Sequence, residues 1–280
     1  MTPRLAAVFA HPDDDAYTLS GSILRREGDL DITIILLTSG GNGPIWEPVA
    51  TRETLAGVRE REEASWAASV GVPSARIEFL RYTDWHVPDA PFENAVERVR
   101  AILEDAAPHA VVTFGPDGMT HHHDHVRAGE IGDEAFARAR SSAWPGAFQR
   151  LYHVALRRST MDAYYREVAE RGLPFGDQDT FLNPVGVPDE TIAVDVDVTD
   201  LYERKVAAIS QHRSQIGELE RLPRDLRPLH LAHECFVQSW PEREAGAVVR
   251  GNLFEDLELA AAAASGRERR GRSRRLGAKR

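Results

Sequence analysis

Hydrophobic and polar positions follow two alternating patterns along the first half of the chain. Short, continuously apolar runs predict buried strands at 5–10, 31–37, 77–80, 110–114 and 151–155. Between them, apolar residues at helical spacing predict helices at about 16–27, 51–70, 92–106 and 124–140. In the helix at 51–70 we expect one charged face and one apolar face of Leu55, Val58, Ala64 and Ala68, with Gly71 ending it. Strands alternating with helices predict an α/β fold, a Rossmann-like three-layer sandwich with a mostly parallel central sheet.

The pattern becomes less regular after residue 158. A helix at about 199–213 is predicted from the spacing of Leu201, Val206 and Ile209, whereas 172–189 is rich in Gly, Pro and Asp and is expected to be a loop. No shift in composition marks a second domain. We therefore expect a single domain at 1–265, in which roughly 158–265 forms a C-terminal cap region on the same core, and a basic, disordered tail at 266–280.

Charge and composition narrow the class of protein. The net charge is −10, although the tail carries eight basic residues and one Glu, so the remainder is strongly acidic. An acidic body argues against a specific nucleic-acid enzyme and favours a small-molecule substrate. No apolar run reaches the roughly 18 residues of a membrane span, and 5–10 is too short for a signal peptide, so we expect a cytoplasmic protein. Nothing in the sequence indicates the oligomeric state.

Cysteine content restricts the kind of metal site. Cys235 is the single cysteine, so an internal disulfide and a cysteine-rich metal site are both excluded. Any bound metal must therefore be held by His and carboxylate side chains.

The first group of candidate residues is His11-Pro12-Asp13-Asp14, directly after the first predicted strand. Open α/β sheets place their binding crevice at this end of a strand, and imidazole and carboxylate are suitable zinc ligands. The alternative is a helix N-cap, for which one Asp suffices. Three successive acids, with Asp15 the third, repel one another unless a cation or the helix dipole offsets them.

A second group of His and Asp residues favours the metal site. His121, His122, His123, Asp124 and His125 follow the fourth predicted strand, and a parallel sheet brings them to the same edge as His11. The alternative is an incidental polyhistidine loop. Three protein ligands with a further position open to water would form a catalytic rather than a structural zinc site.

These two motifs resemble those of the LmbE/PIG-L family of zinc-dependent N-deacetylases. The family, which includes N-acetylglucosaminyl-phosphatidylinositol and mycothiol-type deacetylases, carries Ala-His-Pro-Asp-Asp-Glu after strand one and Gly-His-Pro-Asp-His after strand four. Here the corresponding segments are Ala10 to Asp15 and His121 to His125. The resemblance extends to about residue 240.

The resemblance implies a reaction and a role for each motif residue. The reaction is removal of an acetyl or other acyl group from an amide nitrogen, with an N-acetylated amino sugar or its conjugate as substrate. His11, Asp14 and His125 would bind Zn²⁺, although this ligand set also accepts Fe²⁺, Mn²⁺ or Co²⁺. Asp13 would be the general base, and His122 would stabilise the oxyanion or protonate the leaving amine. Asp15 and Asp124 would contact the ligand side chains and orient them without binding the metal themselves.

Other residues are candidates for substrate contacts. Arg59 with Glu62 matches an Arg-x-x-Glu pattern whose Arg faces substrate in the family, although a solvated ion pair is the alternative. Asp84 and Asn42 are available to bind sugar hydroxyls, and Asp84 is otherwise a turn residue. His212 belongs to a helix-end motif that closes over the site in the family, or is simply a His near a helix C-terminus.

Several positions depart from the family pattern. Asp15 replaces the family Glu, and His121 and His123 stand where Gly and Pro are usual. Thr120 stands where mycothiol-pathway members have a Tyr that assists the chemistry. Two other functions therefore remain as alternatives: an amidase of the same fold acting on a non-sugar or thiol-conjugate substrate, and a noncatalytic metal-binding protein. A nucleotide-binding module is disfavoured because acids replace the glycine-rich loop that a pyrophosphate requires.

Overall fold

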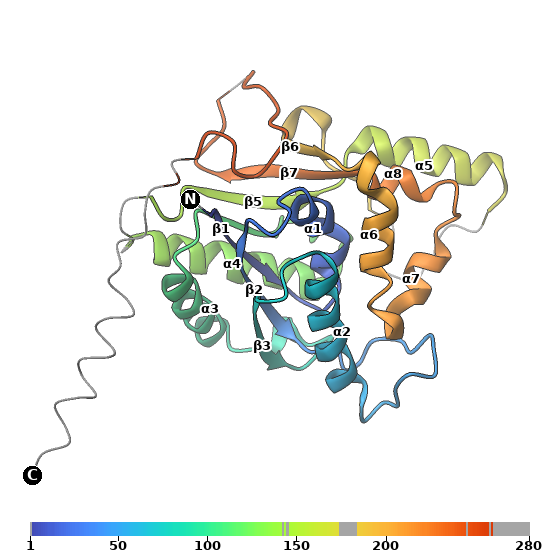
Figure 1. Ribbon diagram of the computed structural model, residues 1–280, viewed down its shortest axis with the longest axis horizontal. Coiled ribbons are helices and arrows are strands. Elements are labelled where there is room, and N and C mark those ends of the chain that lie inside the picture. The colour runs from blue at the N-terminus through green and yellow to red at the C-terminus, as the bar shows by residue number, and fades with distance from the viewer. Residues whose placement is uncertain are drawn as a thin grey trace, which may run out of the picture.

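The computed structural model describes residues 2–141, 143, 146–173, 184–244, 246–257 and 259. Seven strands form one central sheet (Figure 1) in the described residues: β1 (Arg4–Phe9), β2 (Asp31–Thr38), β3 (Arg76–Tyr82), β4 (Ala110–Phe114), β5 (Arg150–Ala155), β6 (Ile192–Asp197) and β7 (His233–Trp240). The α-helices are α1 (Asp14–Leu24), α2 (Leu55–Ser69), α3 (Phe92–Ala106), α4 (His123–Ser141), α5 (Arg158–Glu170), α6 (Tyr202–Ile209), α7 (Ile216–Arg221) and α8 (Arg227–Leu231). Short 3₁₀ turns lie at Val87–Asp89, Asp189–Thr191, Thr199–Leu201 and Arg213–Gln215.

The strand order explains where a site can form. The sheet runs β3-β2-β1-β4-β5-β7-β6, with β1 to β5 parallel and β7 antiparallel to both of its neighbours. The chain proceeds outward from β1 on one side and from β4 on the other, so the crevice between these two strands is the topological switch point. The predicted Rossmann-like, mostly parallel α/β fold is confirmed.

Helices cover both faces of the sheet. On one face α3 packs against α4, and on the other α1 and α2 contact α6 (Figure 1). The central strands read as continuous apolar runs because both faces are covered: all of 32–38 in β2 and all of 110–114 in β4 are buried.

A glycine allows α4 to approach β4 closely. A Cβ at Gly129 would lie 2.6 Å from the backbone oxygen of Phe114, which cannot move aside as a side chain can. We expect Gly129→Ala to lower the free energy of unfolding by about 1–3 kcal/mol in a urea titration, because the helix must shift. Gly57→Ala is the matched control, since its Cβ meets only Arg61 Nη1, at 3.6 Å, and it should stabilise α2 by up to about 1 kcal/mol. Equal effects of the two substitutions would contradict the close approach.

The interior face of α2 differs from the prediction. Ala64 and Ala68 are exposed, and the helix buries Arg59, Glu62 and Glu63 alongside Leu55, Trp66 and Ala67. The helix begins at Leu55 rather than near residue 51 and ends before Gly71, as predicted. Hydrophobic periodicity failed here because the inner face of α2 meets other buried polar groups: Arg59 contacts Asp13, and Glu62 accepts hydrogen bonds from Ser214.

The C-terminal region contributes to the sheet itself. The strands β6 and β7, together with α5, α7 and α8, were not predicted, and β7 pairs with β5 to extend the sheet. The helix expected at 199–213 is a 3₁₀ turn followed by α6, which ends at Ile209. His212 therefore lies beyond the helix. The single-domain boundaries stay a prediction, and the basic tail at 266–280 lies outside the described residues.

Within the part of the chain that the structure describes, no helix combines the length and apolar character needed to cross a bilayer.

Candidate metal and catalytic site

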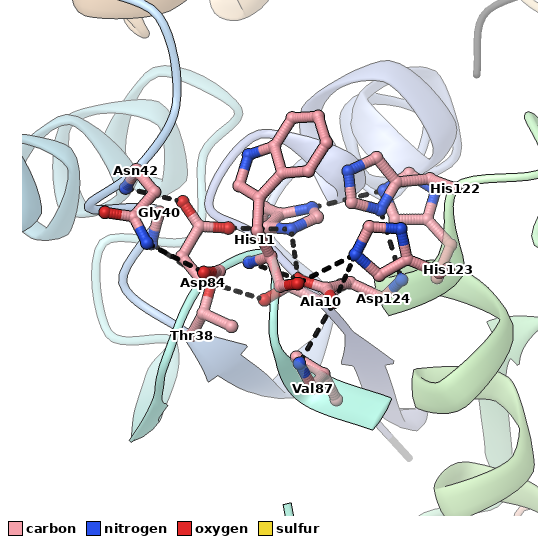
Figure 2. A network of polar contacts seen from close by, with 12 residues as sticks. Ala10, His11, Thr38, Gly40, Asn42, Asp84, Val87, His122, His123 and Asp124 are labelled. Carbon is pink, nitrogen blue, oxygen red and sulfur yellow. Dashed lines mark hydrogen bonds and ion pairs between the residues drawn. The ribbon is translucent and has the colours of Figure 1, made fainter. Parts of the chain in front are cut away.

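The predicted site residues converge at the carboxyl ends of the parallel strands. His11 to Asp14 follow β1, Asn42 follows β2 and Asp84 follows β3, while His122 directly precedes α4 and His123 to His125 form its first turn. The two motifs, more than 100 residues apart in sequence, meet at the switch point between β1 and β4 (Figure 2).

Three side chains form a triangle of potential ligand atoms. His11 Nδ1 lies 3.1 Å from His125 Nε2, and Asp14 Oδ1 lies 3.2 Å from the same His125 nitrogen. Asp14 Oδ2 is 3.7 Å from His11 Nδ1. All three residues are at least nine-tenths buried.

Backbone groups fix the orientation of two of these side chains, Asp14 and His125. Asp14 Oδ2 accepts hydrogen bonds from the backbone N–H groups of Ala10 and His11, at 3.1 and 2.8 Å. His125 Nδ1 lies 3.1 Å from the carbonyl oxygen of Gly118, and its ring stacks on Phe114 with centroids 4.1 Å apart. Donation from Nδ1 to that carbonyl leaves Nε2 as the nitrogen that faces His11 and Asp14.

The triangle has the dimensions of a divalent metal site. Ligand bonds of about 2.0–2.2 Å in a tetrahedral arrangement place ligand atoms about 3.3–3.6 Å apart. His125 Nε2 lies at comparable distances of 3.1 Å from His11 Nδ1 and 3.2 Å from Asp14 Oδ1, and the other Asp14 oxygen, Oδ2, is 3.7 Å from His11 Nδ1. Two imidazole nitrogens and one carboxylate oxygen form a donor set suited to Zn²⁺ and to other divalent transition metals. The residues present therefore fit a metal ion.

The second nitrogen of His11 faces two carboxylates. Nε2 lies 3.3 Å from Asp124 Oδ2 and 3.2 Å from Asp84 Oδ1. Asp124 also accepts hydrogen bonds from the backbone N–H groups of Trp85 and Val87, at 2.7 and 3.0 Å. Figure 2 shows His11 between the Asn42–Asp84 pair on one side and His122 and His123 on the other. A carboxylate behind a ligating His is the usual device that orients it and raises its basicity.

Charges within the cluster shift the pKa values of its members. Burial lowers the pKa of His11, but Asp124, Asp14 and Asp84 outweigh it and hold that pKa well above its usual value. Burial raises the pKa of Asp14, but the charge of His125 and the His11 hydrogen bond outweigh it, leaving that pKa well below the usual range. For Asp84 the effect of burial is likewise overcome by His11, and its pKa is lowered to about 2. Ionised carboxylates thus face the imidazoles.

Asp13 occupies the turn between β1 and α1 in a left-handed conformation, with φ of 112°. Its Oδ2 lies 3.1 Å from Arg59 Nη2, and Arg59 also donates to the carbonyl oxygens of Pro12 and Gly40. Arg59 is 3% exposed, which rules out the solvated pair with Glu62. Burial raises the pKa of Asp13 well above its usual value, against the lowering effect of Arg59. A raised carboxyl pKa suits a general base that works near neutrality.

His122 lies against the other imidazoles. Its ring is stacked on His125 with centroids 4.8 Å apart and meets His11 edge to face at 4.9 Å. Its Nδ1 accepts the backbone N–H of Asp124 at 3.1 Å. Burial, reinforced by His11 and His125, lowers the pKa of His122 to about 3. A neutral His122 with Nδ1 as acceptor carries its proton on Nε2, where it can donate a hydrogen bond.

The remaining predicted residues, Asn42, Asp15 and His212, lie around the triangle rather than in it. Asn42 and Asp84 bond each other, since Asp84 Oδ2 accepts the Asn42 N–H at 2.7 Å and Asn42 Nδ2 donates to the Asp84 carbonyl at 2.8 Å. Asp15 and His212 lie together with Glu63, apart from the triangle. Burial raises the pKa of Asp15 to about 7 and lowers that of His212 to about 3.

Sequence reasoning missed two acidic residues. Glu63 lies on the buried face of α2, and Glu218 lies on α7, where its charge acts on Asp13. Burial raises the pKa of Glu218. The one signal that pointed to this region was the segment His212 to Gln215, which precedes α7; α7 itself was not predicted.

Comparison with known sequences identifies relatives of the chain. Residues 6–136 match the PIG-L family, described as GlcNAc-PI de-N-acetylase. A 1D-myo-inositol 2-acetamido-2-deoxy-alpha-D-glucopyranoside deacetylase from Mycobacterium sp. (strain KMS) is 32% identical over 243 residues, covering 78% of this chain and 75% of the relative. The deacetylase of the same name from Actinosynnema mirum is 31% identical, covering 76% and 81%.

Solved structures share the fold. N,N'-diacetylchitobiose deacetylase from Pyrococcus horikoshii aligns with a TM-score of 0.55 at 22% identity, over 84% of this chain and 83% of that one. The 4-carboxy-2-hydroxymuconate hydratase GalB from Pseudomonas putida aligns with a TM-score of 0.57 at 17% identity, over 88% and 100%. Because a hydratase has this fold too, the fold by itself does not define the reaction.

Fold and site together define an α/β protein with a His and carboxylate cluster at the switch point of a mostly parallel sheet. The sequence relatives make the assignment specific: the chain belongs to the PIG-L family, whose curated members named above are deacetylases. The family resemblance predicted from the two motifs is confirmed.

Proposed function

We propose that this chain is a zinc-dependent hydrolase that removes the acetyl group from an N-acetylated amino sugar or its conjugate. The observation that carries the proposal is the triangle of His11, Asp14 and His125 with Asp13 directly beside it, on the turn that precedes Asp14. Family membership supports the reaction class, and the relatives' names support the substrate class.

His11, Asp14 and His125 would hold the metal ion. A zinc ion there would supply Lewis-acid chemistry, polarising the amide carbonyl and making water more acidic. Asp124 and Asp84 keep His11 aligned through its other nitrogen, and Gly118 does the same for His125.

Asp13 would transfer the proton during the reaction, and His122 would stabilise the negative charge that develops on the substrate oxygen. Asp13 accepts a proton as the oxygen of water forms a bond to the acetyl carbon. His122 is neutral and can donate a hydrogen bond to the negative oxygen that develops on that carbon. When the carbon–nitrogen bond breaks, the proton taken up by Asp13 is available for the leaving amine. Arg59 positions Asp13 for these transfers through its contact at 3.1 Å.

The reaction is tested by measuring acetate release from a panel of N-acetyl amino sugars, their inositol conjugates and acylated thiol conjugates. We expect turnover of at least one amino-sugar substrate and little with the thiol conjugates, because Thr120 stands where mycothiol-pathway members have the assisting Tyr. Hydrolysis of the thiol conjugates alone would support the alternative amidase. No acetate release from any substrate by protein loaded with metal would contradict the proposed function.

Replacing one metal ligand should abolish metal binding at the triangle without unfolding the protein. We expect His125→Ala to lose the ion bound at this triangle and to lower kcat/KM by at least about 10³-fold, since the charge stabilisation that the metal supplies is removed. Metal content by elemental mass spectrometry and circular dichroism are measured on the same preparation. A folded variant that retains the ion and the activity would show that His125 is not a ligand.

A further inference from the structure

Three further ionisable side chains are buried together beside the candidate metal ligands, and one of them, Asp15, directly follows the ligand Asp14 in sequence. Asp15 lies in the first turn of α1, Glu63 in the middle of α2, and His212 in the segment between α6 and the 3₁₀ turn at Arg213–Gln215. Their exposed fractions are 0%, 0% and 2%. None of the three belongs to the triangle of His11, Asp14 and His125.

The polar atoms of these side chains are unsatisfied. Among the described residues, both carboxylate oxygens of Asp15, both of Glu63 and both ring nitrogens of His212 are buried without a hydrogen-bond partner, apart from the approach of the two carboxyl groups to each other. Among the residues that the structure describes, neither acid has a Lys or Arg within ion-pair distance, and Arg59 is engaged with Asp13. A buried carboxylate without a partner is costly, and two together are more so.

The spacing of the donor atoms matches a cation site. His212 Nε2 lies 3.9 Å from Glu63 Oε2, and one donor atom from each of the three residues lies within 4.8 Å of the others. Metal bonds of about 2.0–2.2 Å place tetrahedral ligand atoms about 3.3–3.6 Å apart, so these side chains would draw slightly closer together when an ion binds. The buried imidazole is an observation independent of the two acids, because neither of its nitrogens has a hydrogen-bond partner in the described part of the chain and its Nε2 is directed at Glu63.

We propose that Asp15, Glu63 and His212 bind a second divalent cation, distinct from the one held by the catalytic triangle. Two carboxylates balance the charge of a divalent ion, and a nitrogen donor beside them favours Zn²⁺, Mn²⁺ or a similar transition metal. Such an ion joins α1, α2 and the segment after α6 at their point of contact. It thereby stiffens the turn that carries Asp13 and Asp14.

A shared proton is the alternative arrangement. One protonated acid can donate a hydrogen bond to the other, which removes the charge repulsion between Asp15 and Glu63. That arrangement leaves both nitrogens of His212 unsatisfied at 2% exposure. A cation satisfies the two acids and one nitrogen of His212 at once, so the geometry favours it.

The proposal is tested by counting bound zinc. The full chain is saturated with Zn²⁺, freed of excess metal by gel filtration and analysed by elemental mass spectrometry. We expect Glu63→Gln to hold about one ion per chain fewer than the wild type. Glu60→Gln is the matched control, because Glu60 lies on the same helix but bonds Ser39 and Arg81 instead, and it should lose none. Equal zinc content in the folded wild type and Glu63→Gln would overturn the proposal and support the shared proton.

A second variant tests the site if Glu63→Gln does not fold. His125→Ala disables the catalytic triangle and leaves Asp15, Glu63 and His212 intact, so it should still retain about one tightly bound zinc ion that raises its thermal midpoint. A folded His125→Ala that retains no zinc and shows no thermal shift on zinc addition would overturn the second site. The acetate-release assay is independent of these counts, so failure of the proposed function and failure of this inference are distinguishable.

Discussion

Replacing Asp13 by Asn should lower kcat by about 10²–10⁴-fold while leaving the metal content unchanged. The amide cannot accept the proton that Asp13 is proposed to take from water, yet the side chain keeps its size. Asn is the suitable replacement because Asp13 has φ of 112°, and Asn tolerates positive φ better than Ala does. The measurement combines steady-state kinetics with zinc analysis.

The matched control for Asp13 is its neighbour. Asp14→Asn should lose the ion bound at the triangle and the activity together, because Asp14 Oδ1 faces the His125 nitrogen at 3.2 Å. An increase in KM with unchanged kcat in Asp13→Asn would assign Asp13 to substrate binding rather than proton transfer. Loss of zinc in Asp13→Asn would instead make it a metal ligand.

Replacing Lys205 by Met should lower the free energy of unfolding by about 3–5 kcal/mol. Lys205 Nζ lies 2.8 Å from Glu234 Oε1, and the two side chains are 0% and 1% exposed. Glu234 also accepts the backbone N–H groups of Gly21 and Ser22, each at 2.7 Å, which ties β7 and α6 to α1. Without Lys205 the Glu234 carboxylate stays buried with no balancing cation. Urea titration gives the change in free energy.

The control restores electrical neutrality. Lys205→Met combined with Glu234→Gln should recover most of the lost stability, because Gln can still accept a hydrogen bond from Gly21 or Ser22 without carrying a charge. A loss below about 1 kcal/mol in Lys205→Met alone would show that the charge of Glu234 is balanced by another group. A double variant no more stable than the single one would show that packing dominates.

Much of the site could be predicted because both motifs directly follow apolar strands. A parallel sheet places the carboxyl ends of its strands at one edge, so the ends of 5–10 and 110–114 indicated that His11 and His125 would meet. Their ring nitrogens are 3.1 Å apart. Local sequence also predicted α3 and β4 with the bounds that the structure shows.

Prediction was weaker wherever polar residues are buried. The inner face of α2 carries Arg59, Glu62 and Glu63, which a hydrophobic pattern assigns to solvent. Arg59 pairs with Asp13, and Glu62 accepts hydrogen bonds from the N–H and hydroxyl of Ser214, at 2.8 and 2.6 Å. These partners are 46 and 152 positions away in sequence, so no local pattern contains them.

The sequence by itself determined the alternation of strands and helices, and it indicated the metal-type donor set at one sheet edge. These follow from local hydrophobic periodicity and from residue types at the ends of strands. Tertiary structure alone decided that β6 and β7 extend the sheet, that Arg59 contacts Asp13, and that Asp15 meets Glu63 and His212. The physical reason is that burial and pairing of charges depend on segments distant in the chain, whose contacts exist only once the helices have packed on the sheet.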